Sequence, residues 1–347
     1  MSLLLVLAAM IWGAAFVAQS EGTKYVQACT FVCTRYILSA AILIPLGLIR
    51  GRRGGTMPLG RAEFKHALTG GLVCGIFLAL ASLSQQVGIE TTTVGKGGFI
   101  TALYVVGVPL LGIFFGKRPP LRIWLCVALS VIGLYLISVK AGFTIEKGDA
   151  LMILCAVIFS FQIMSVDHFS KGTDNVLLLA GLQFLVTAVV SGIGMLLFET
   201  PRWADITAAA VPILYAGVMS GAVGYTLQML GQKYTDPAIA SLIMSLEAVF
   251  SALTGWIILH ERLSGREIIG CAVLFAAVIL AQLPEKSAAG LNRKILRFAQ
   301  NDTENARNDT ENARNDTENA RNDNGCHPER AERAEGSSCS TNWNTFE

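Results

Sequence analysis

The chain has 347 residues, is 53% hydrophobic and only 15% charged, and carries a formal net charge of +2. Soluble domains contain about 25% charged residues, so this deficit indicates a protein surrounded by lipid. The charges lie in short connecting stretches and in the C-terminal part, where they form no basic face, so the composition argues against a nucleic-acid-binding protein.

Ten apolar stretches are long enough to cross a membrane. A helix needs about 20 apolar residues to span a hydrocarbon core about 30 Å thick. In chain order the predicted spans are residues 2–19, 28–49, 67–88, 94–116, 121–139, 149–167, 175–198, 206–230, 237–260 and 266–283. The first lacks the basic N-terminal region and cleavage site of a signal peptide, so we expect it to remain as a span. The sequence therefore predicts an all-α integral membrane protein with ten transmembrane helices.

Small side chains inside these stretches indicate close helix packing. Glycines recur at four-residue spacing, as at Gly71 and Gly75 or at Gly217 and Gly221, and such spacing lets helix backbones approach closely in lipid. Six of the eight cysteines lie inside apolar stretches, and no CxxC pair or metal-ligand spacing is present. We interpret these cysteines as packing residues and expect neither a metal nor a cofactor.

The basic residues of the connecting loops predict the orientation, because Lys and Arg are enriched in cytoplasmic loops. Residues 50–65, after the second span, contain five basic residues, and residues 116–122, after the fourth, contain three. The loops after the first and seventh spans contain only Lys24 and Arg202. We therefore expect spans two and four to end in the cytoplasm, which places both termini there.

The chain also matches itself. GKRPPLRIW (116–124) lies over HERLSGREI (260–268), and AAMIWGAAF (8–16) lies over CAVIFSFQI (155–163). Each copy contains five spans, and because five is odd the second copy enters the membrane from the opposite side. Two such inverted five-helix repeats are typical of secondary transporters, in which a site near the midplane lies between the halves.

Several segments resemble the ten-helix EamA-like branch of the drug/metabolite transporter superfamily. They are WGAAFVAQ (12–19), TRYILSAAIL (34–43), GKGGFITALYVVGVPLLGIFFGKR (95–118) and SLEAVFSALTGWIILHERLSGREIIGCAVLFAAVIL (245–280). The resemblance implies two EamA-like repeats, at residues 1–139 and 149–283. It also implies alternating-access transport of small organic metabolites, such as amino acids or related compounds, and export rather than import.

This sequence departs from that family's pattern at two positions. Lys117 stands where the family usually carries the Glu of a Gly-Glu-Arg motif, which the second half keeps as Glu261, and Ala248 stands where many members have Pro. Neither departure argues against the fold, but both leave the subfamily, the substrate and the coupling ion open. A monomer and a homodimer are both compatible with the sequence.

Three ionisable residues fall inside the predicted spans, and a charge at the bilayer centre costs at least about 2.5–3.5 kcal/mol. Glu247 is a candidate proton site, or a neutral side chain between helices. Arg35 is a candidate for binding an anionic substrate group, or for bracing Glu247 or a carbonyl. Lys96 lies near a span end, so it can line a cavity mouth or extend to the interface.

Arg35 and Glu247 are expected at similar depth. At about 1.5 Å per residue, Glu247 lies roughly 15 Å from one surface and Arg35 roughly 10–12 Å from the other. In a core of about 30 Å their depths differ by about 4 Å. Their repeat partners in the sequence alignment, Leu103 and Gln183, are uncharged. We therefore expect the two charges to face a central cavity and to interact in at least one conformation.

Six uncharged residues are further candidates for lining that cavity. They are Trp12, Tyr104, Gln162, Gln183, Gln228 and Ser245. For each of them, packing between helices is the alternative interpretation, and Trp12 lies mid-span rather than in an interfacial belt. Jointly they favour a site for a small amphipathic solute.

Other classes of membrane protein fit less well. A membrane enzyme acting on lipid needs convergent catalytic groups, but His66, His168 and His260 lie at span ends, and Asp167 beside His168 points in a different direction on a helix. The sequence contains none of the common hydrolase, phosphate-loop or zinc motifs. A channel is disfavoured because no ring of like polar residues recurs along a span.

Residues 284–347 are expected to form a disordered cytoplasmic tail. NDTENAR occurs three times at 301–321, and a heptad without large apolar residues gives no coiled-coil seam. The flanking segments resemble translated bacterial repetitive DNA, which favours a protein of the bacterial inner membrane. A docking tail is the alternative interpretation.

Overall fold

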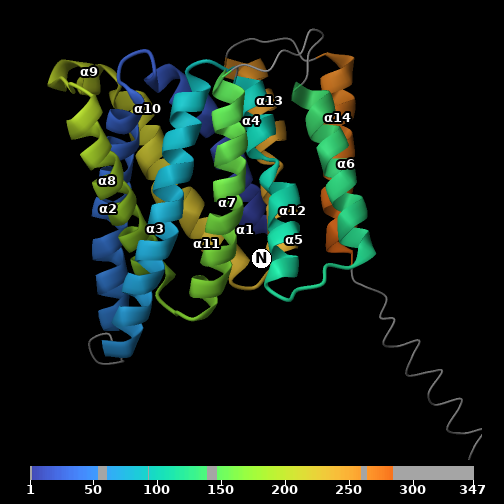
Figure 1. Cartoon of the computed structure of the whole chain (residues 1–347), viewed down its shortest axis with the longest axis horizontal. Coiled ribbons are helices and arrows are strands. Elements are labelled where there is room, and N and C mark those ends of the chain that lie inside the picture. The colour runs from blue at the N-terminus through green and yellow to red at the C-terminus, as the bar shows by residue number, and fades with distance from the viewer. Residues whose placement is uncertain (1, 54–60, 93, 139–146, 259–263, 284–347) are drawn as a thin grey trace, which may run out of the picture. The chain divides into compact units, whose positions relative to one another are not determined.

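The computed structural model describes residues 2–53, 61–92, 94–138, 147–258 and 264–283. Their regular elements are all helices, with no strand among them (Figure 1). The chain divides into Met1–Leu283 and Pro284–Glu347. The prediction of a disordered tail lies outside the described residues.

The helices follow the predicted spans. In chain order they are α1 Ser2–Gly22, α2 Ala28–Arg53, α3 Arg61–Ile89, α4 Val94–Thr101, α5 Tyr104–Phe114, α6 Leu121–Ser138, α7 Lys147–Lys171, α8 Val176–Phe198, α9 Trp203–Ala208, α10 Ala210–Leu214, the π-helix η1 Tyr215–Gly224, α11 Tyr225–Gln232, α12 Pro237–Met244, α13 Glu247–Ile258 and α14 Gly265–Gln282. Nine helical segments of the described chain, counting each interrupted helix once, are long and apolar enough to cross a membrane, and Leu121–Ile137 is a shorter apolar helix. The predicted all-α membrane architecture is confirmed.

The fourth and ninth spans are not continuous, contrary to the prediction. After Thr101 and again after Met244, two residues interrupt the helix. There the backbone tightens to bonds between residues three apart: the Leu103 N–H donates to the Ile100 carbonyl, and the Leu246 N–H donates to the Ile243 carbonyl, both at 3.2 Å. Short stretches of this kind within a helix often mark a functional hinge.

The eighth span differs from the prediction in another way. Its middle is the π-helix η1, whose ten residues include three glycines. Ser39 Oγ on α2 donates to the Gly217 carbonyl at 2.7 Å, and a Cβ on Gly217 would lie 2.8 Å from the Arg35 carbonyl. The glycines therefore allow α2 to lie directly against a loosened helix, and π-helical turns are frequent at functional sites.

Corresponding helices of the two repeats match in length and position. Helices α6 and α14 have 18 residues each and lie side by side (Figure 1). The interruptions end where α5 begins at Tyr104 and where α13 begins at Glu247. Tyr104 is therefore the structural counterpart of Glu247, and the sequence alignment that paired Glu247 with Leu103 was one residue out of register.

A glycine contact fixes α1 against α13. A Cβ on Gly13 would lie 2.5 Å from the Phe250 Cβ and 2.7 Å from the Phe250 backbone. The counterpart contact joins α7 to α5, where Gly107 accommodates Ser160. Each interrupted helix is thus seated by one glycine against the first helix of the other repeat, and dispersion contacts at such close approach hold helices together in lipid.

This contact yields a test of packing. Gly13→Ala should destabilise the protein by about 1–3 kcal/mol, because backbone atoms of α13 must move. The matched control is Gly98→Ala on α4, where the nearest atom to a new Cβ is 3.7 Å away. The control should be neutral or slightly stabilising, since Ala favours a helix. Thermal unfolding in detergent measures both; an unchanged Tm for Gly13→Ala would contradict the close contact.

Candidate functional site

A cavity with both apolar and polar lining lies between the two interrupted helices. Its volume is about 50 Å³, and it is lined by residues of both repeats. Thr101 and Tyr104 flank the first interruption, and Met244 and Glu247 flank the second; all four face the cavity. The two hinge-like stretches therefore frame one site at the centre of the helical unit.

The cavity collects polar atoms that have no hydrogen-bond partner among the described residues. Six lining side chains contribute such atoms: Gln19, Arg35, Tyr104, Gln162, Gln228 and Glu247. Leaving one buried polar group unsatisfied costs about 1–3 kcal/mol. Six around one small space are therefore expensive for the protein alone, which indicates that a polar ligand or water completes their bonding.

Glu247 is the first residue of α13 and is only 4% exposed. A carboxylate in the first turn of a helix is stabilised by the partial positive charge of the free N–H groups there. Its Oε1 accepts no hydrogen bond from the described residues. The Tyr104 phenol lines the same cavity. The two counterpart residues of the interruptions thus share one site.

Arg35 reaches the cavity from α2 and is 3% exposed. Its Nη2 donates to the Tyr36 hydroxyl at 3.1 Å, and its guanidinium carbon lies 4.5 Å from the Tyr36 ring centroid. The described residues place no carboxylate within ion-pair distance of it. Arg35 and Glu247 share the cavity, but the expected interaction between them is not formed in this conformation.

Aromatic rings form one wall of the cavity. The Trp12 ring lies 4.9 Å from that of Tyr225, and Trp12 Nε1 donates to the Ser220 carbonyl in η1 at 3.2 Å. Tyr225 in turn contacts Phe184 edge-on at 5.4 Å, and Phe184 stacks on Tyr36 at 5.2 Å. The wall is rigid and amphipathic, suited to an apolar group next to charged ones.

Three of the residues singled out from the sequence lie elsewhere. Lys96 Nζ lies 2.5 Å from Asp149 Oδ2 at one end of α7. Ser245 Oγ donates to the Leu242 carbonyl of its own helix at 2.7 Å. Gln183 is fully buried in α8, close to Gly75 of α3, and both its amide atoms lack partners among the described residues.

Other lining residues were not singled out from the sequence. They are Ala15, Phe16, Gln19, Tyr36, Gln85, Thr101, Phe159, Ile163, Ser220, Tyr225 and Met244. The repeat offers a signal that finds several of them, because Trp12 corresponds to Phe159 and Gln85 corresponds to Gln228. Gln19, Tyr36 and Tyr225 have no such signal, because their repeat counterparts do not line the cavity.

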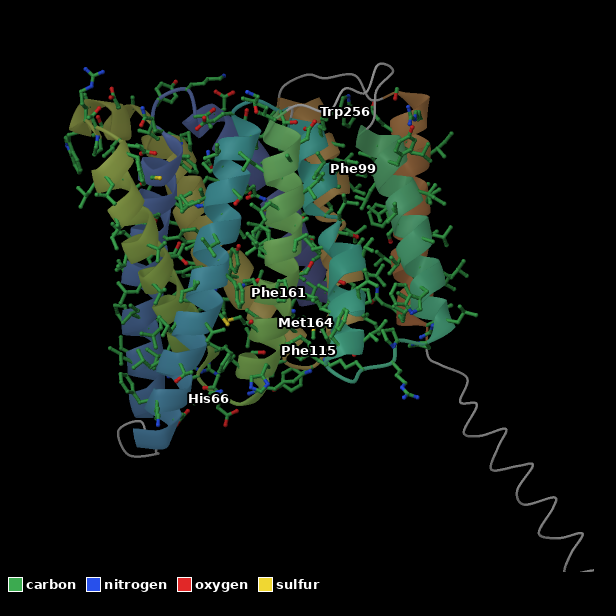
Figure 2. The ribbon with its side chains drawn as sticks, viewed as in Figure 1. His66, Phe99, Phe115, Phe161, Met164 and Trp256 are labelled. Carbon is green, nitrogen blue, oxygen red and sulfur yellow. The ribbon has the colours of Figure 1, made fainter. Side chains whose placement is uncertain are left out.

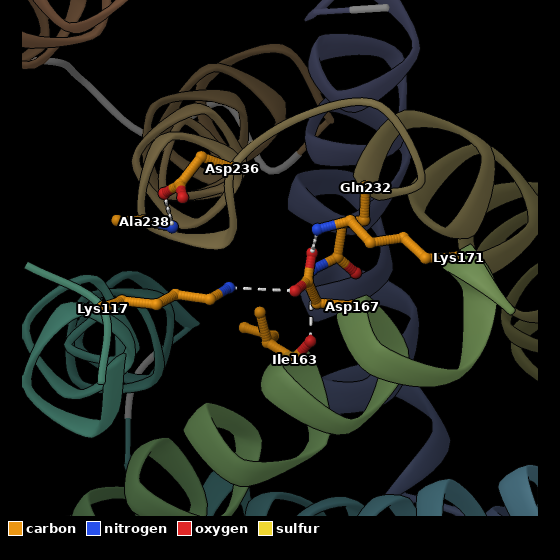
Figure 3. Close-up of polar contacts among 7 residues, drawn as sticks. All are labelled: Lys117, Ile163, Asp167, Lys171, Gln232, Asp236 and Ala238. Carbon is orange, nitrogen blue, oxygen red and sulfur yellow. Dashed lines mark hydrogen bonds and ion pairs between the residues drawn. The ribbon is translucent and has the colours of Figure 1, made fainter. Parts of the chain in front are cut away.

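At one end of α7, hereafter the Lys117 end, Asp167 joins two basic residues (Figure 3). Lys117, just after α5, lies 3.1 Å from Asp167 Oδ2, and Lys171 lies 2.6 Å from Oδ1. Nearby, Gln232 Nε2 donates to the Ile163 carbonyl at 3.3 Å (Figure 3). The Lys117–Asp167 pair connects the two repeats. Both carboxylate oxygens of Asp167 are thus held in ion pairs.

Further contacts join the repeats at the Lys117 end. Figure 2 places His66 and Phe115 there and Phe99 and Trp256 at the opposite end. The His66 ring nitrogen lies 3.2 Å from the Phe169 carbonyl. Beside this contact, Lys233 hydrogen-bonds the exposed Asp174, which lowers the pKa of that carboxyl.

The opposite end of α7, hereafter the Lys96 end, carries a second inter-repeat ion pair. Asp149 accepts from Thr92 Oγ1 at 2.8 Å and pairs with Lys96. At the same end, Glu199 accepts from the Cys29 and Thr30 N–H groups at 2.7 and 2.8 Å. That carboxylate caps the first turn of α2 from the other repeat. Both ends of the cavity are thus bridged by polar contacts.

The described residues contain no group of three His, Cys, Asp or Glu side chains placed to hold a metal ion. The site instead offers buried charge, amides and aromatic rings. Such a constellation can bind an amphipathic solute, but it presents no activated nucleophile.

Comparison with known proteins agrees with this architecture. The sequence profile of the EamA-like transporter family matches residues 1–139 and 146–283. A protein of Archaeoglobus fulgidus, named as an uncharacterized transporter, is 29% identical over 284 residues, covering 80% of this chain and 84% of that protein. A WAT1-related chloroplastic protein of Arabidopsis thaliana is 24% identical, over 79% of this chain and 67% of its own.

Two more distant likenesses cover most of the same helices. Solute carrier family 35 member B1 of Xenopus tropicalis is 24% identical over 218 residues, which is 58% of this chain and 65% of that protein. A crystal structure with 19% sequence identity superposes with a TM-score of 0.66, covering 81% of this chain and 96% of the other. Since the profile spans both five-helix halves, the chain belongs to the EamA-like transporter family and is a membrane transporter of the drug and metabolite kind.

Proposed function

We propose that the protein exports a small organic solute carrying both an anionic and a cationic group, such as an amino acid or a related compound, by alternating access. The observation that carries this proposal is the presence of Arg35 and Glu247, buried and not paired with each other, in one cavity between the two repeats. Arg35 would hold the anionic group of the solute, and Glu247 the cationic group.

The buried charges of Arg35 and Glu247 favour a solute that carries both an anionic and a cationic group. An unpaired buried charge is much more costly than a paired one. A zwitterion supplies the missing partner to each residue at once, whereas a simple anion or cation would satisfy only one. The amides of Gln162 and Gln228 add hydrogen-bonding groups, and the Trp12–Tyr225 wall accommodates an apolar side group.

The cavity volume implies that binding requires movement. An engineered protein cavity of about 150 Å³ binds benzene. The 50 Å³ present here holds a few water molecules at most. An amino-acid-sized solute therefore enters only when the helices separate. The interruptions at 102–103 and 245–246 are the natural hinges, since the fourth span can bend between α4 and α5 and the ninth between α12 and α13.

The ion pairs at the two ends of α7 would act as latches. Lys117–Asp167 and Lys96–Asp149 both join α7 to the interrupted fourth span. Opening the cavity at either end separates the repeats there and so breaks one pair while the other persists. Lys96 would thus control access and not contact the solute.

Glu247 is the candidate proton site for coupling. The free energy of protonating Glu247 depends on whether the cationic group of the solute is bound. A bound ammonium favours the ionised carboxylate. Proton binding would therefore compete with binding of the cationic group. Protons moving inward could drive the solute outward, which fits export.

We further propose that the protein lies in a bacterial inner membrane with both termini in the cytoplasm. The basic loops support this orientation: the Lys117 end then faces the cytoplasm, and the Lys96 end faces outward. The tail after residue 283 is proposed to be dispensable for transport.

The roles of Arg35 and Glu247 can be tested by a transport assay once the solute is known. Metabolite profiling of the medium from cells with and without the protein identifies the solute. Glu247→Gln and Arg35→Gln should each lower transport at least tenfold at matched expression, since each removes one contact to the ligand, worth about 1.5–3 kcal/mol. Glu267→Gln makes the same chemical change at an exposed cap of α14 and should transport normally. Normal transport by Glu247→Gln between pH 6 and 8 would refute the role of that residue.

The latch at the Lys117 end gives a second test. A cysteine at Gln228, which lines the cavity, should react with a membrane-impermeant thiol reagent about fivefold faster in Asp167→Asn. The Lys117–Asp167 ion pair is partly exposed and should stabilise the closed end by about 1 kcal/mol. Losing it should raise the population of the open state about fivefold. Lys171→Gln is the control: Lys171 also binds Asp167 but from the same helix. Equal rates in Asp167→Asn and wild type would contradict the latch.

Orientation is tested separately in intact cells. In a cysteine-free background, cysteines at Thr56 and Arg118 should be shielded from an impermeant thiol reagent, and cysteines at the exposed Lys24 and at Asp205 should react. This labelling pattern is expected because the basic loops after spans two and four should lie in the cytoplasm. The reverse labelling pattern would show that the protein is inserted the other way round.

A further inference from the structure

The two repeats line the cavity with matched pairs of residues over part of its surface. Trp12 and Phe159, Gln85 and Gln228, and Tyr104 and Glu247 are counterparts that all line it. Arg35 and Tyr36 of α2 and Tyr225 of α11 form a wall without such a match, because the corresponding residues of α8 and α3 stay outside; Gln19 of α1 is also unmatched. This asymmetry distinguishes the present conformation from the alternative that the pseudo-two-fold axis of the repeats relates to it.

The missing counterparts can be identified by counting along the helices. Arg35 is the eighth residue of α2, which begins at Ala28, and Gln183 is the eighth residue of α8, which begins at Val176. In the same way, Tyr225 and Ser82 are counterparts, because each lies equally far before the last residue of its helix, Gln232 of α11 and Ile89 of α3. Arg35 and Tyr225 line the cavity, while Gln183 and Ser82 do not.

Gln183 is nonetheless built like a binding residue. Its side chain has no exposed surface, and neither the oxygen nor the nitrogen of its amide has a partner among the described residues. Its neighbour Phe184 stacks on Tyr36, which follows Arg35, with ring centroids 5.2 Å apart. Phe184 and Tyr36 are themselves counterparts, so the symmetry axis of the repeats passes between them. Gln183 directly precedes Phe184, and Arg35 directly precedes Tyr36. The two residues therefore lie on opposite sides of that axis.

In a transporter built from inverted repeats, alternating access moves one repeat against the other around a fixed site. Because the two repeats share one fold, the alternative conformation is taken to be the one in which each repeat adopts the arrangement of the other. In the alternative conformation, α2 would move away from the cavity, and residues of α8 and α3 would line it instead. We propose that Gln183 and Ser82 line the substrate cavity in the conformation open at the Lys117 end, where Gln183 takes the position that Arg35 holds in the conformation described here. This inference rests on the proposed transport function.

The exchange has a chemical consequence. With Arg35 in the wall, the site presents a guanidinium to the anionic group of the solute; with Gln183 in the wall, it presents a neutral amide. Hydrogen bonds to charged groups contribute about twice as much as neutral ones. The solute is therefore held more tightly in the conformation that exposes Arg35, and the two faces of the membrane meet sites of different affinity.

The proposal is tested by cysteine labelling in sealed vesicles of both orientations, using 2-sulfonatoethyl methanethiosulfonate, which does not cross membranes. Single cysteines replace Gln183, Ser82, Arg35 or Ser191 in a cysteine-free full-length chain. Ser191 is the control, because it is equally buried in α8 but its α2 counterpart, Leu43, lies outside the cavity lining. Ser82→Cys is nearly isosteric and guards against misfolding of Gln183→Cys.

Gln183→Cys and Ser82→Cys should react at least tenfold faster when the reagent is applied at the Lys117 end. Arg35→Cys should prefer the Lys96 end, and Ser191→Cys should stay unreactive from both. If Gln183→Cys and Ser82→Cys are as unreactive as Ser191→Cys while Arg35→Cys reacts, the inference fails and the proposed function stands. If Arg35→Cys is also unreactive from both sides, the proposed transport site itself fails.

Discussion

Lipid offers no hydrogen bonds, so every backbone N–H and C=O in a spanning segment must be satisfied within the protein. Irregular backbone is then tolerated only where other protein groups or a polar cavity complete the bonding. This constraint explains why the tightened stretches after Thr101 and Met244 meet at one place. Thr101, Tyr104, Met244 and Glu247 flank these stretches and line the cavity, so the irregular backbone lies next to the polar lining.

Buried charge is the second consequence of the low dielectric. The α7 ends carry their acidic residues in ion pairs, Asp149 with Lys96 and Asp167 with Lys117. In the cavity Glu247 lies at a helix N-terminus and pairs with no basic side chain of the described residues. The paired charges connect the repeats, whereas the unpaired ones are the residues proposed to bind a ligand.

Much of this arrangement could be predicted from sequence because lipid imposes simple rules. Hydropathy located the spans, and the rarity of charge inside them pointed to Glu247. The interruptions were missed because their residues are as apolar as a continuous helix. Lys96 was left between two roles, since its partner Asp149 belongs to a distant span. Gln19 was overlooked because one sequence does not show which face of a helix meets a cavity.

The central claim is that the repeats exchange arrangements around a fixed cavity, so the two ends must open in opposition. Spin labels at Arg118 and Tyr234 report the Lys117 end, and labels at Thr91 and Trp203 report the Lys96 end; all four side chains are exposed. Pulsed electron–electron double resonance gives each distance distribution, with Asp167→Asn used to weaken one end. The account predicts a longer distance at the Lys117 end with no lengthening at the Lys96 end, where the Lys96–Asp149 pair persists. Simultaneous lengthening at both ends, as in a channel, would contradict it.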